Sequence, residues 1–291
     1  MSSEDSILVP MQGDQVERVC SLFAGIHHTA AQIFREGWEE GQAEAWVSEG
    51  MDPTGAFGTV FRDEYVVCYA AFDAAQLSIA LIQLLDERLV DVIGRRGARP
   101  LLCNVRGDME PVIALLRQRC FTEDSLGYEL KCCAVPDLVQ QEIGLDVRSF
   151  EPDQFEAYVT LLDGAFNPLM QQAGHPPNPF AREREDLRQR LMDRSTKGDF
   201  AAFWRGQRLI GLYYLSGDVI DVLAVHPDFH HAGFGTVLIQ RAARQVLQVR
   251  GYPAAYLFVV AANEAASRLY LRLGFEESGF YSENTYAGIN C

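Results

Sequence analysis

The stretch VIDVLAVHPDFHHAGFGTVLIQRAARQV (residues 219–246) decides the fold that we expect for this chain. Its first seven residues are apolar and rich in β-branched side chains, which predicts a strand, and Asp221 alone interrupts them. HPDFHHAG (226–233) is rich in turn-forming residues, and FGTVLIQRAARQVLQVRG (234–251) has apolar residues at helical spacing. The pattern therefore predicts a strand, a loop and then a helix with glycines at its start.

The glycines of this loop suit a bound anion. The first turn of a helix has N–H groups without partners and a partial positive charge, and Gly233 and Gly235 have no Cβ to hold a ligand away. The loop lacks the third glycine of a GxGxxG motif and the GK[ST] of a phosphate loop. A metal bound by His226, His230 and His231 would be a cation at the positive end of a helix, so no metal is expected. A phosphate site and an ordinary glycine turn with surface histidines remain as alternatives.

Composition and charge narrow the class of protein. The chain of 291 residues is 48% hydrophobic and 22% charged, which is typical of a globular protein with two ordinary domains or one large one. Its net charge is −15, and residues 1–143 carry −12 of it, from 23 Asp and Glu against 11 Lys and Arg. This balance disfavours nucleic acid as a partner. No apolar run is long enough to cross a membrane, so no membrane partner is expected.

The cysteines and the amino terminus bear on the compartment. Seven cysteines occur without a CxxC pair or a regular spacing, which is typical of reduced thiols rather than of a disulfide framework or a zinc site. The first residues, MSSED, have neither the basic nor the apolar region of a signal peptide. We therefore expect a cytoplasmic protein, either a monomer or a homodimer.

The chain contains a two-fold repeat. Three pairs of segments align in the same order: 8–25 with 147–164, 57–72 with 200–215, and 96–121 with 250–275. We expect one domain over residues 1–140 and a second over 145–291, with the boundary in VPDLVQQEIG (135–144).

The two copies differ in length at one place. There are 25 positions from Phe72 to Gly97 in the first copy and 36 from Leu215 to Gly251 in the second, which makes the first copy 11 residues shorter. On this alignment the missing piece is the stretch around DVLAVHPDFHHAGFG (221–235). We therefore expect the anion loop in the second domain alone.

Together with LFVVAANEAASRLYLRLGF (257–275), the loop resembles the GNAT superfamily of N-acetyltransferases. In that family, a strand leads to a Pro-x-x-Arg/Gln-x-x-Gly-x-Gly/Ala loop, followed by a strand, an Asn and an LY-x-x-x-GF ending. Here these parts are PDFHHAGFG (227–235), Asn263 and LYLRLGF (269–275), and the resemblance covers about residues 145–285. It implies a mixed α/β fold of α+β type, with two tandem GNAT-like domains, each a twisted mixed sheet flanked by helices. The first copy would then be degenerate.

The resemblance also implies a co-substrate, acetyl-coenzyme A, with its pyrophosphate in the loop and its pantetheine arm along the strand. His230 stands where the family has Arg or Gln, so an affinity that varies with pH is expected unless the ring contributes only packing. The cofactor-binding residues implied are Leu223, Ala224, Val225, His230, His231, Ala232, Gly233, Phe234, Gly235, Thr236, Asn263 and Tyr270. Asn263 can equally be a helix N-cap.

Two residues are candidates for proton transfer. The family assigns the proton donor for the leaving thiolate to Tyr270, although a buried aromatic would also fit, and the first copy has Leu116 at that position. Asp221 lies two residues before Leu223 in the strand, so strict alternation would place both on one face. In several family members a carboxylate there accepts the amine proton. A solvated or salt-bridged residue is the alternative.

The acceptor is less well specified. The segment DGAFNPLMQQAGHPPNPFAREREDLRQRL (163–191), with Tyr281 and Glu283, is expected to form the pocket rim. The leading hypothesis is transfer of an acetyl group from acetyl-coenzyme A to a primary amine of a small molecule, directly within a ternary complex, and the acidic balance favours a cationic acceptor. A peptide or protein N-acetyltransferase is a second enzymatic hypothesis. A non-catalytic acyl-coenzyme A sensor is the hypothesis from another class.

Overall fold

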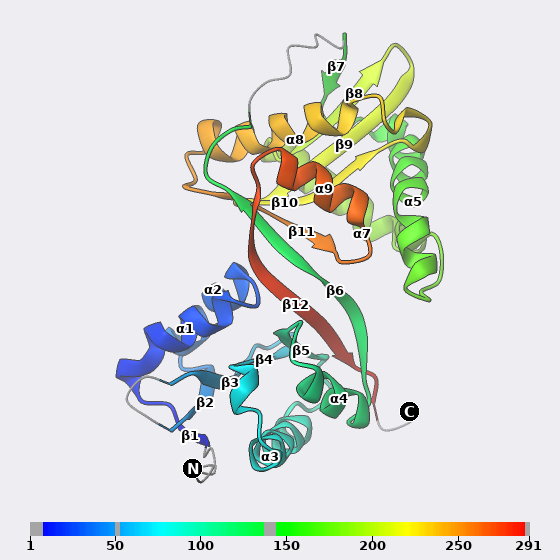
Figure 1. Cartoon of the computed structure of the whole chain (residues 1–291). Helices are drawn as coiled ribbons and strands as arrows, with labels where there is room; N and C mark the ends of the chain where they lie inside the picture. Colours follow the sequence, from blue (N-terminus) through cyan, green and yellow to red (C-terminus); the bar gives the residue numbers. More distant parts are fainter. Residues whose placement is uncertain (1–7, 50–52, 137–143, 289–291) are drawn as a thin grey trace. The chain divides into compact units, whose positions relative to one another are not determined.

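The protein is described by a computed structural model that covers residues 8–49, 53–136 and 144–288 (Figure 1). The chain divides into two compact units. The first comprises residues 1–129 and 277–291, and the second comprises residues 130–276. Both contain strands and helices around a mixed sheet, so the expected α/β class is confirmed.

The first unit begins at strand β1 and ends at strand β12. Its strands are β1 Leu8–Pro10, β2 Ala43–Ser48, β3 Gly55–Phe61, β4 Val66–Phe72, β5 Leu101–Arg106, most of β6 Phe121–Cys132, and β12 Glu276–Tyr286. Its helices are η1 Gly13–Gln15, α1 Val16–Ala24, α2 His28–Glu39, η2 Ala74–Gln76, α3 Ile79–Arg95 and α4 Glu110–Gln118. The strand order is β1-β2-β3-β4-β5-β12.

Each face of the first unit's sheet is covered by helices. Helices α3 and α4 supply Leu85 and Ile113 to one buried cluster, which also includes Cys68 of β4. Helices α1 and α2 supply Phe23 and Phe34 to a second cluster on the other face. Apolar residues at helical spacing on these amphipathic helices thus find a partner in the sheet, which is what stabilises the layers.

The second unit repeats this plan, and its helices α5 and α7 are longer than α1 and α2 of the first unit. Its strands are β7 Asp146–Arg148, β8 Phe200–Arg205, β9 Arg208–Ser216, β10 Val219–Val225 and β11 Ala255–Val260. Its helices are η3 Pro152–Gln154, α5 Phe155–Gln172, α6 Pro179–Arg182, α7 Arg184–Thr196, η4 Pro227–Phe229, α8 Phe234–Arg244, the π-helical turn η5 Gln245–Val249, and α9 Glu264–Arg272. The strand order is β11-β10-β9-β8-β7, and the end of β6 is the neighbour of β11.

The core of the second unit lies between the sheet and helices α5 and α7. Tyr158 of α5 and Leu191 of α7 pack with Trp204, Tyr214 and Ala224 of the sheet. The aromatic residues Phe203, Tyr213 and Tyr214 of β8 and β9 are buried. They are therefore part of the strand core.

The unit boundaries differ from those expected. We expected the second domain to span residues 145–291, whereas the structure places residues 277–291 in the first unit. The cause is β12, which pairs antiparallel with β5 from Tyr281↔Arg106 to Thr285↔Leu102. Tyr281 and Glu283 are thus strand residues of the first unit, not residues of the second. Most of the expected boundary segment, residues 137–143, lies outside the described residues.

The alignment of the two copies was wrong by one strand. In the sheets, β2, β3 and β4 occupy the positions of β8, β9 and β10, because β4 is parallel to β5 as β10 is parallel to β11. The hairpin of residues 57–72 therefore corresponds to β9 and β10, not to β8 and β9. The first copy does not lack the strand of the anion loop. Its main deficit lies earlier, because 32 residues separate β1 from β2 and 51 separate β7 from β8.

The first copy nevertheless lacks the loop chemistry. Six residues, DAAQLS (73–78), connect β4 to α3, and none of them is glycine. The Asp73 side chain accepts a hydrogen bond from Ala75 N–H (3.0 Å), and Ser78 caps α3 by accepting from Leu81 N–H (3.1 Å). N–H groups that could meet an anion are thus satisfied by side chains.

The cysteines differ from expectation at one position. Cys20, Cys68, Cys103, Cys132 and Cys133 are free thiols. Cys120 is in a disulfide bond, so the expectation of reduced thiols throughout is wrong at this residue.

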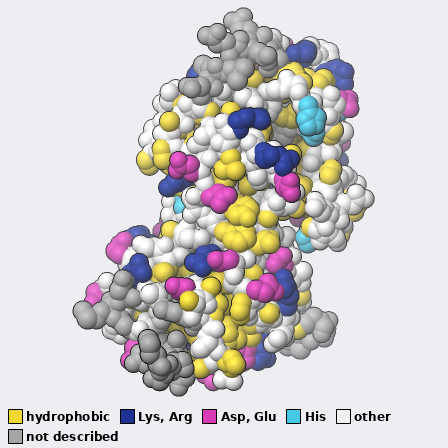
Figure 2. All heavy atoms as spheres, in the orientation of Figure 1, with side chains coloured by type: hydrophobic (Ala, Val, Ile, Leu, Met, Phe, Trp, Pro, Cys, Tyr) yellow, Lys and Arg dark blue, Asp and Glu magenta, His cyan; other side chains and the backbone are white. Residues whose placement is uncertain are grey.

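Surface charge is mixed. On the described part of the face drawn in Figure 2, Lys and Arg side chains lie among Asp and Glu side chains, without a continuous patch of one sign. Among the described residues, the helices are all too short or too polar to cross a bilayer.

Candidate functional site

Strands β10 and β11 are paired over only two residue pairs and then separate. Their parallel pairing is Val219↔Tyr256 and Ile220↔Leu257, although β10 continues to Val225 and β11 to Val260 (Figure 1). The corresponding strands of the first unit, β4 and β5, stay paired over five residues, from Val66↔Leu101 to Ala70↔Val105. The second unit therefore has an opening between two strands that the first unit lacks. Along it, β10 keeps its hydrogen bonds to β9 alone.

A bulge lies where the strands separate. The register of β10 with β9 shifts between Ile220 and Val222, which breaks strict alternation at Asp221. Val222 and Ala224 face helices α5 and α7, and Asp221 also meets side chains of α7. The expectation that Asp221 shares a face with Leu223 is therefore wrong, because it assumed a regular strand.

The loop after β10 is fixed by its own histidines. His226 Nδ1 accepts a hydrogen bond from Asp228 N–H (3.2 Å), and His230 Nε2 lies 3.0 Å from the carbonyl oxygen of Val225. With its proton on Nε2, His230 donates to the strand that it follows, which leaves Nδ1 for a ligand. Among the described residues, no three His, Cys, Asp or Glu side chains are arranged to hold a metal.

The backbone of the loop presents its N–H groups. His231 (φ 61°) and Gly233 (φ 84°) both adopt the left-handed conformation, and α8 begins directly afterwards. Residues 231–236 are all described, and none of their N–H groups donates a hydrogen bond to another described residue. Six consecutive donors at the positive end of an eleven-residue helix form a site for an anion.

Two arginines of the β8–β9 hairpin approach this loop. The Arg205 guanidinium lies 5.2 Å from the ring centre of Phe234, and that of Arg208 lies 4.8 Å from Phe229. Arg208 also pairs with Asp228 (3.2 Å), whereas Arg205 has no ion pair among the described residues. Arg205 therefore adds positive charge where the loop has histidines instead of an arginine.

Helix α9 packs against the start of α8. A Cβ on Gly235 would come within 3.2 Å of Leu269 Cδ2, so glycine allows this close approach. Asn263 caps α9, and its side-chain oxygen accepts a hydrogen bond from Ala266 N–H (3.2 Å). The structural role of Asn263 is thus present, and its Nδ2 has no partner within the described protein.

Tyr270 lies one residue after Leu269 on α9. Its ring centre is 6.0 Å from that of Phe275, and its hydroxyl has no hydrogen-bond partner among the described residues. Burial raises the pKa of Tyr270 to about 12, so the phenol stays protonated at neutral pH. A protonated and unpartnered hydroxyl can donate to a group placed against it.

Asp221 lies in a charged cluster. Its side chain is 41% exposed, and its Oδ2 is 3.9 Å from Arg194 Nη2 on α7. Burial raises the pKa of Asp221, and the charges of Arg194 and Arg190 oppose that rise. The salt-bridged alternative for Asp221 is therefore present in the structure, together with a perturbed carboxyl group suited to proton transfer.

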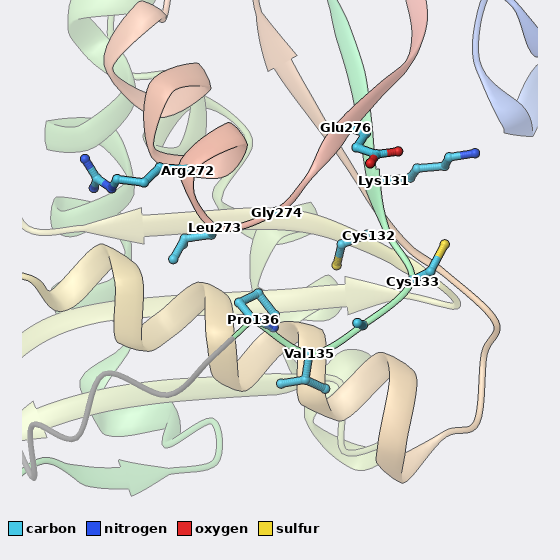
Figure 3. Close-up of a pocket in the computed structure, with 10 residues that line it drawn as sticks. Lys131, Cys132, Cys133, Val135, Pro136, Arg272, Leu273, Gly274 and Glu276 are labelled. Atoms are coloured by element: carbon cyan, nitrogen blue, oxygen red, sulfur yellow. The ribbon is translucent and has the colours of Figure 1, made fainter.

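The cavity found in the second unit is elsewhere. It has a volume of about 560 Å³ and lies between the end of β6 and the end of α9 (Figure 3). In Figure 3, the side chains of Cys132 and Cys133 point to opposite sides of the chain, and Arg272 points away from both. None of the site residues expected from the sequence lines this cavity.

Sequence reasoning did not identify four arginines near the candidate site, two in the β8–β9 hairpin and two on α7. Arg205 and Arg208 flank the turn of a hairpin that the sequence had assigned only to structure. Arg190 and Arg194 are four residues apart on α7, in register with the buried Leu187 and Leu191. That spacing, in a helix already expected at the pocket rim, was the available signal.

Comparisons with known proteins concern the sequence of the second unit above all. Residues 166–275 match the acetyltransferase (GNAT) family. A mycothiol acetyltransferase of Thermomonospora curvata is 32% identical over 208 residues, covering 64% of this chain and 64% of that protein. A mycothiol acetyltransferase of Streptomyces coelicolor is 35% identical over 145 residues, covering 45% and 43%. The match thus spans less than two thirds of these relatives' length.

A solved structure supports the fold over the whole chain. A GCN5-related N-acetyltransferase from Sphaerobacter thermophilus superposes with a TM-score of 0.55, at 17% identity, over 99% of this chain and 98% of that one. The matched segment contains the loop, the parted strands and the helix with Tyr270. Residues 166–275 of this chain are thus similar to the acetyltransferase (GNAT) family.

Proposed function

We propose that the second unit transfers an acetyl group from acetyl-coenzyme A to a primary amine of a small molecule, directly within a ternary complex. The observation that carries this proposal is the opening between β10 and β11, which leads to the six N–H donors of residues 231–236. These donors fit a pyrophosphate, and the unpaired edge of β10 fits the amides of a pantetheine arm. Arg205 adds charge for phosphate groups at the same end.

Acetyl-coenzyme A supplies an acetyl thioester, at whose carbonyl carbon the amine nitrogen forms a bond as the C–S bond breaks. Asp221 is proposed to accept the proton that the amine loses, directly or through water. Tyr270 donates the proton of its hydroxyl to the leaving sulfur. The backbone N–H groups near Leu223 to Val225 orient and polarise the carbonyl, in the manner of an oxyanion hole.

The test is release of free thiol from acetyl-coenzyme A in the presence of a panel of primary amines. Thiol release that depends on an amine, with a matching N-acetylated product, is the expected result. Tight binding of coenzyme A without thiol release for any amine would contradict the proposal and favour the acyl-coenzyme A sensor. Release with peptides alone would favour the peptide N-acetyltransferase.

Asp221 predicts the acidic side of the pH profile. A base must be ionised, so kcat/KM is expected to fall as pH drops through the pKa of Asp221, which burial raises above the ordinary value of about 3.9. Asp221→Asn should lower kcat/KM at pH 7 by about 10- to 100-fold and remove this acidic limb. Profiles for two acceptors of different amine pKa identify the group. If the acidic limb of the kcat/KM profile shifts with the pKa of the amine and is still present in Asp221→Asn, the assignment to Asp221 is wrong.

The first unit is proposed to bind no coenzyme A. Its strands β4 and β5 are closed, and its α3 start is capped by Ser78. Calorimetric titration of the whole chain with coenzyme A should give one equivalent per chain. A second equivalent would show that the first unit has a donor site of its own.

A further inference from the structure

Helix α7 turns two guanidinium groups toward the bulge of β10. Its buried residues Leu187 and Leu191 fix which side of the helix meets the sheet. Arg190 follows Leu187 by three residues, and Arg194 follows Leu191 by three, so the two arginines are one helical turn apart. They therefore stand at the margin of the packed face, next to β9 and β10.

The two arginines have different partners. Arg194 Nη2 lies 3.1 Å from Ser216 Oγ and 3.9 Å from Asp221 Oδ2, so its charge is matched by a carboxylate. Arg190 lies near the hydroxyl of Tyr214, which acts on the pKa of Arg190 as a hydrogen-bonding group. Burial lowers the pKa of Arg190, but this hydrogen bond and the charges of Tyr214, Asp221 and Glu183 outweigh it and raise the pKa. Arg190 thus has no direct ion pair among the described residues, whereas Arg194 has one.

The other two arginines of α7 have partners away from the bulge. Arg184 forms an ion pair with Glu156, and Arg188 lies over the ring of Phe155 at 4.1 Å. Among the described residues, no carboxylate lies within 4.0 Å of Arg190. Asp221 therefore has two guanidinium groups near it, and Arg190 has no direct ion pair, although the charge of Glu183 also acts on Arg190 from beyond 4.0 Å.

The charges near the bulge are mixed, unlike the acidic balance of the whole chain. The net charge of −15 favours a cationic acceptor, but charges further than a Debye length of about 10 Å are largely screened. A substrate at the bulge meets Asp221, Arg194 and Arg190 at close range. The local groups, not the overall charge, therefore decide which acceptor is favoured.

We propose that the acceptor is an amine that also carries a carboxylate, as amino acids do, with its ammonium group at Asp221 and its carboxylate at Arg190. This rests on the proposed acetyl transfer and names the substrate class of that site. A guanidinium binds a carboxylate through two parallel hydrogen bonds, which fixes orientation as well as charge. Held in this way, the amine nitrogen faces the carboxylate that takes its proton.

Matched pairs of acceptors test this proposal. An amino acid and its carboxamide, such as alanine and alaninamide, differ in the acidic group and keep the amine in place. We expect kcat/KM for thiol release to be about 10- to 100-fold higher for the acid, the range for one charged hydrogen-bonded contact. Arg190→Gln should remove this preference by raising KM for the acid, with little effect on the amide. Arg190→Lys should restore part of it.

Arg188→Gln is the matched control, because it removes the same charge from the same helix at a residue that contacts Phe155 instead. It should leave the preference unchanged. Turnover of acid and amide at equal kcat/KM, or a preference that persists in Arg190→Gln, would overturn the inference and leave acetyl transfer intact. If no amine is acetylated, the proposed function fails, and calorimetric binding of the same pairs decides the inference. Equal affinity for acid and amide would then refute it.

Discussion

Replacing Tyr270 with phenylalanine is expected to lower kcat by about 10²- to 10⁴-fold, the usual contribution of a general acid. The change removes one hydroxyl and keeps the ring that contacts Phe275. Because that hydroxyl has no partner within the described protein, folding loses no hydrogen bond. Steady-state rates of thiol release, with calorimetric affinity for coenzyme A, measure the effect. The affinity should stay within about threefold, since the lost group acts in the chemical step.

The pH dependence adds a second measurement. Burial raises the pKa of Tyr270 to about 12, so the acid remains protonated and no alkaline loss of kcat from this residue is expected below about pH 11. Tyr158→Phe is the control. The hydroxyl of Tyr158, on α5, accepts a hydrogen bond from Glu151 N–H (3.3 Å), so its loss affects folding and not the proposed chemistry. That variant should lose about 1 kcal/mol of stability and keep its kcat. A Tyr270→Phe enzyme as fast as Tyr158→Phe would exclude the acid role.

Gly233→Val is expected to weaken coenzyme A binding by about 10- to 100-fold. Gly233 has φ 84°, a conformation that costs a β-branched residue about 1–3 kcal/mol. The loop would relax to another conformation, in which the six N–H donors of residues 231–236 no longer point toward one anion. At saturating donor, kcat should change far less than the dissociation constant, because the groups at the bulge and on α9 remain in place.

Gly251→Val separates this effect from general strain. Gly251 has φ 73°, and no neighbour lies within 4 Å of a Cβ built there, so the backbone cost is similar. It follows η5, at the far end of the α8 segment from the loop. Both variants should lower the melting temperature, but Gly251→Val should bind coenzyme A like the unchanged protein. Equal affinity of all three proteins would mean that the loop does not hold the donor.

The sequence predicted the local structure around the loop and failed on comparison of the copies. VIDVLAV, the glycine turn and the following helix carry strong local signals, and β10, η4 and α8 form there. The alignment was displaced because apolar β-strands resemble one another, so a hairpin fits equally well one strand further along. Parallel pairing of β4 with β5 corrects it, and pairing between distant segments leaves little trace in either sequence.

The sequence predicted the backbone of the candidate site, but it did not predict which charged side chains lie around that backbone. The glycines at positions 233 and 235 mark the loop by their residue type alone. The face of Asp221 depends on a bulge, which shifts alternation by one residue without a signal such as glycine at that position. The role proposed for Arg190 depends on the rotation of α7 against the sheet. Such rotation is set by packing of Leu187 and Leu191, and so by tertiary structure.

The exchange of terminal strands has a consequence for how this gene can be divided. The end of β6, encoded in the first half, borders β11 of the second unit, whereas β12, the last strand encoded, pairs with β5 of the first. A second half cut from the first would have a sheet with an unpaired edge at β11, open to self-association, and an unpaired strand β12 at its carboxyl end. We therefore expect that the two copies must be expressed and engineered together as one segment.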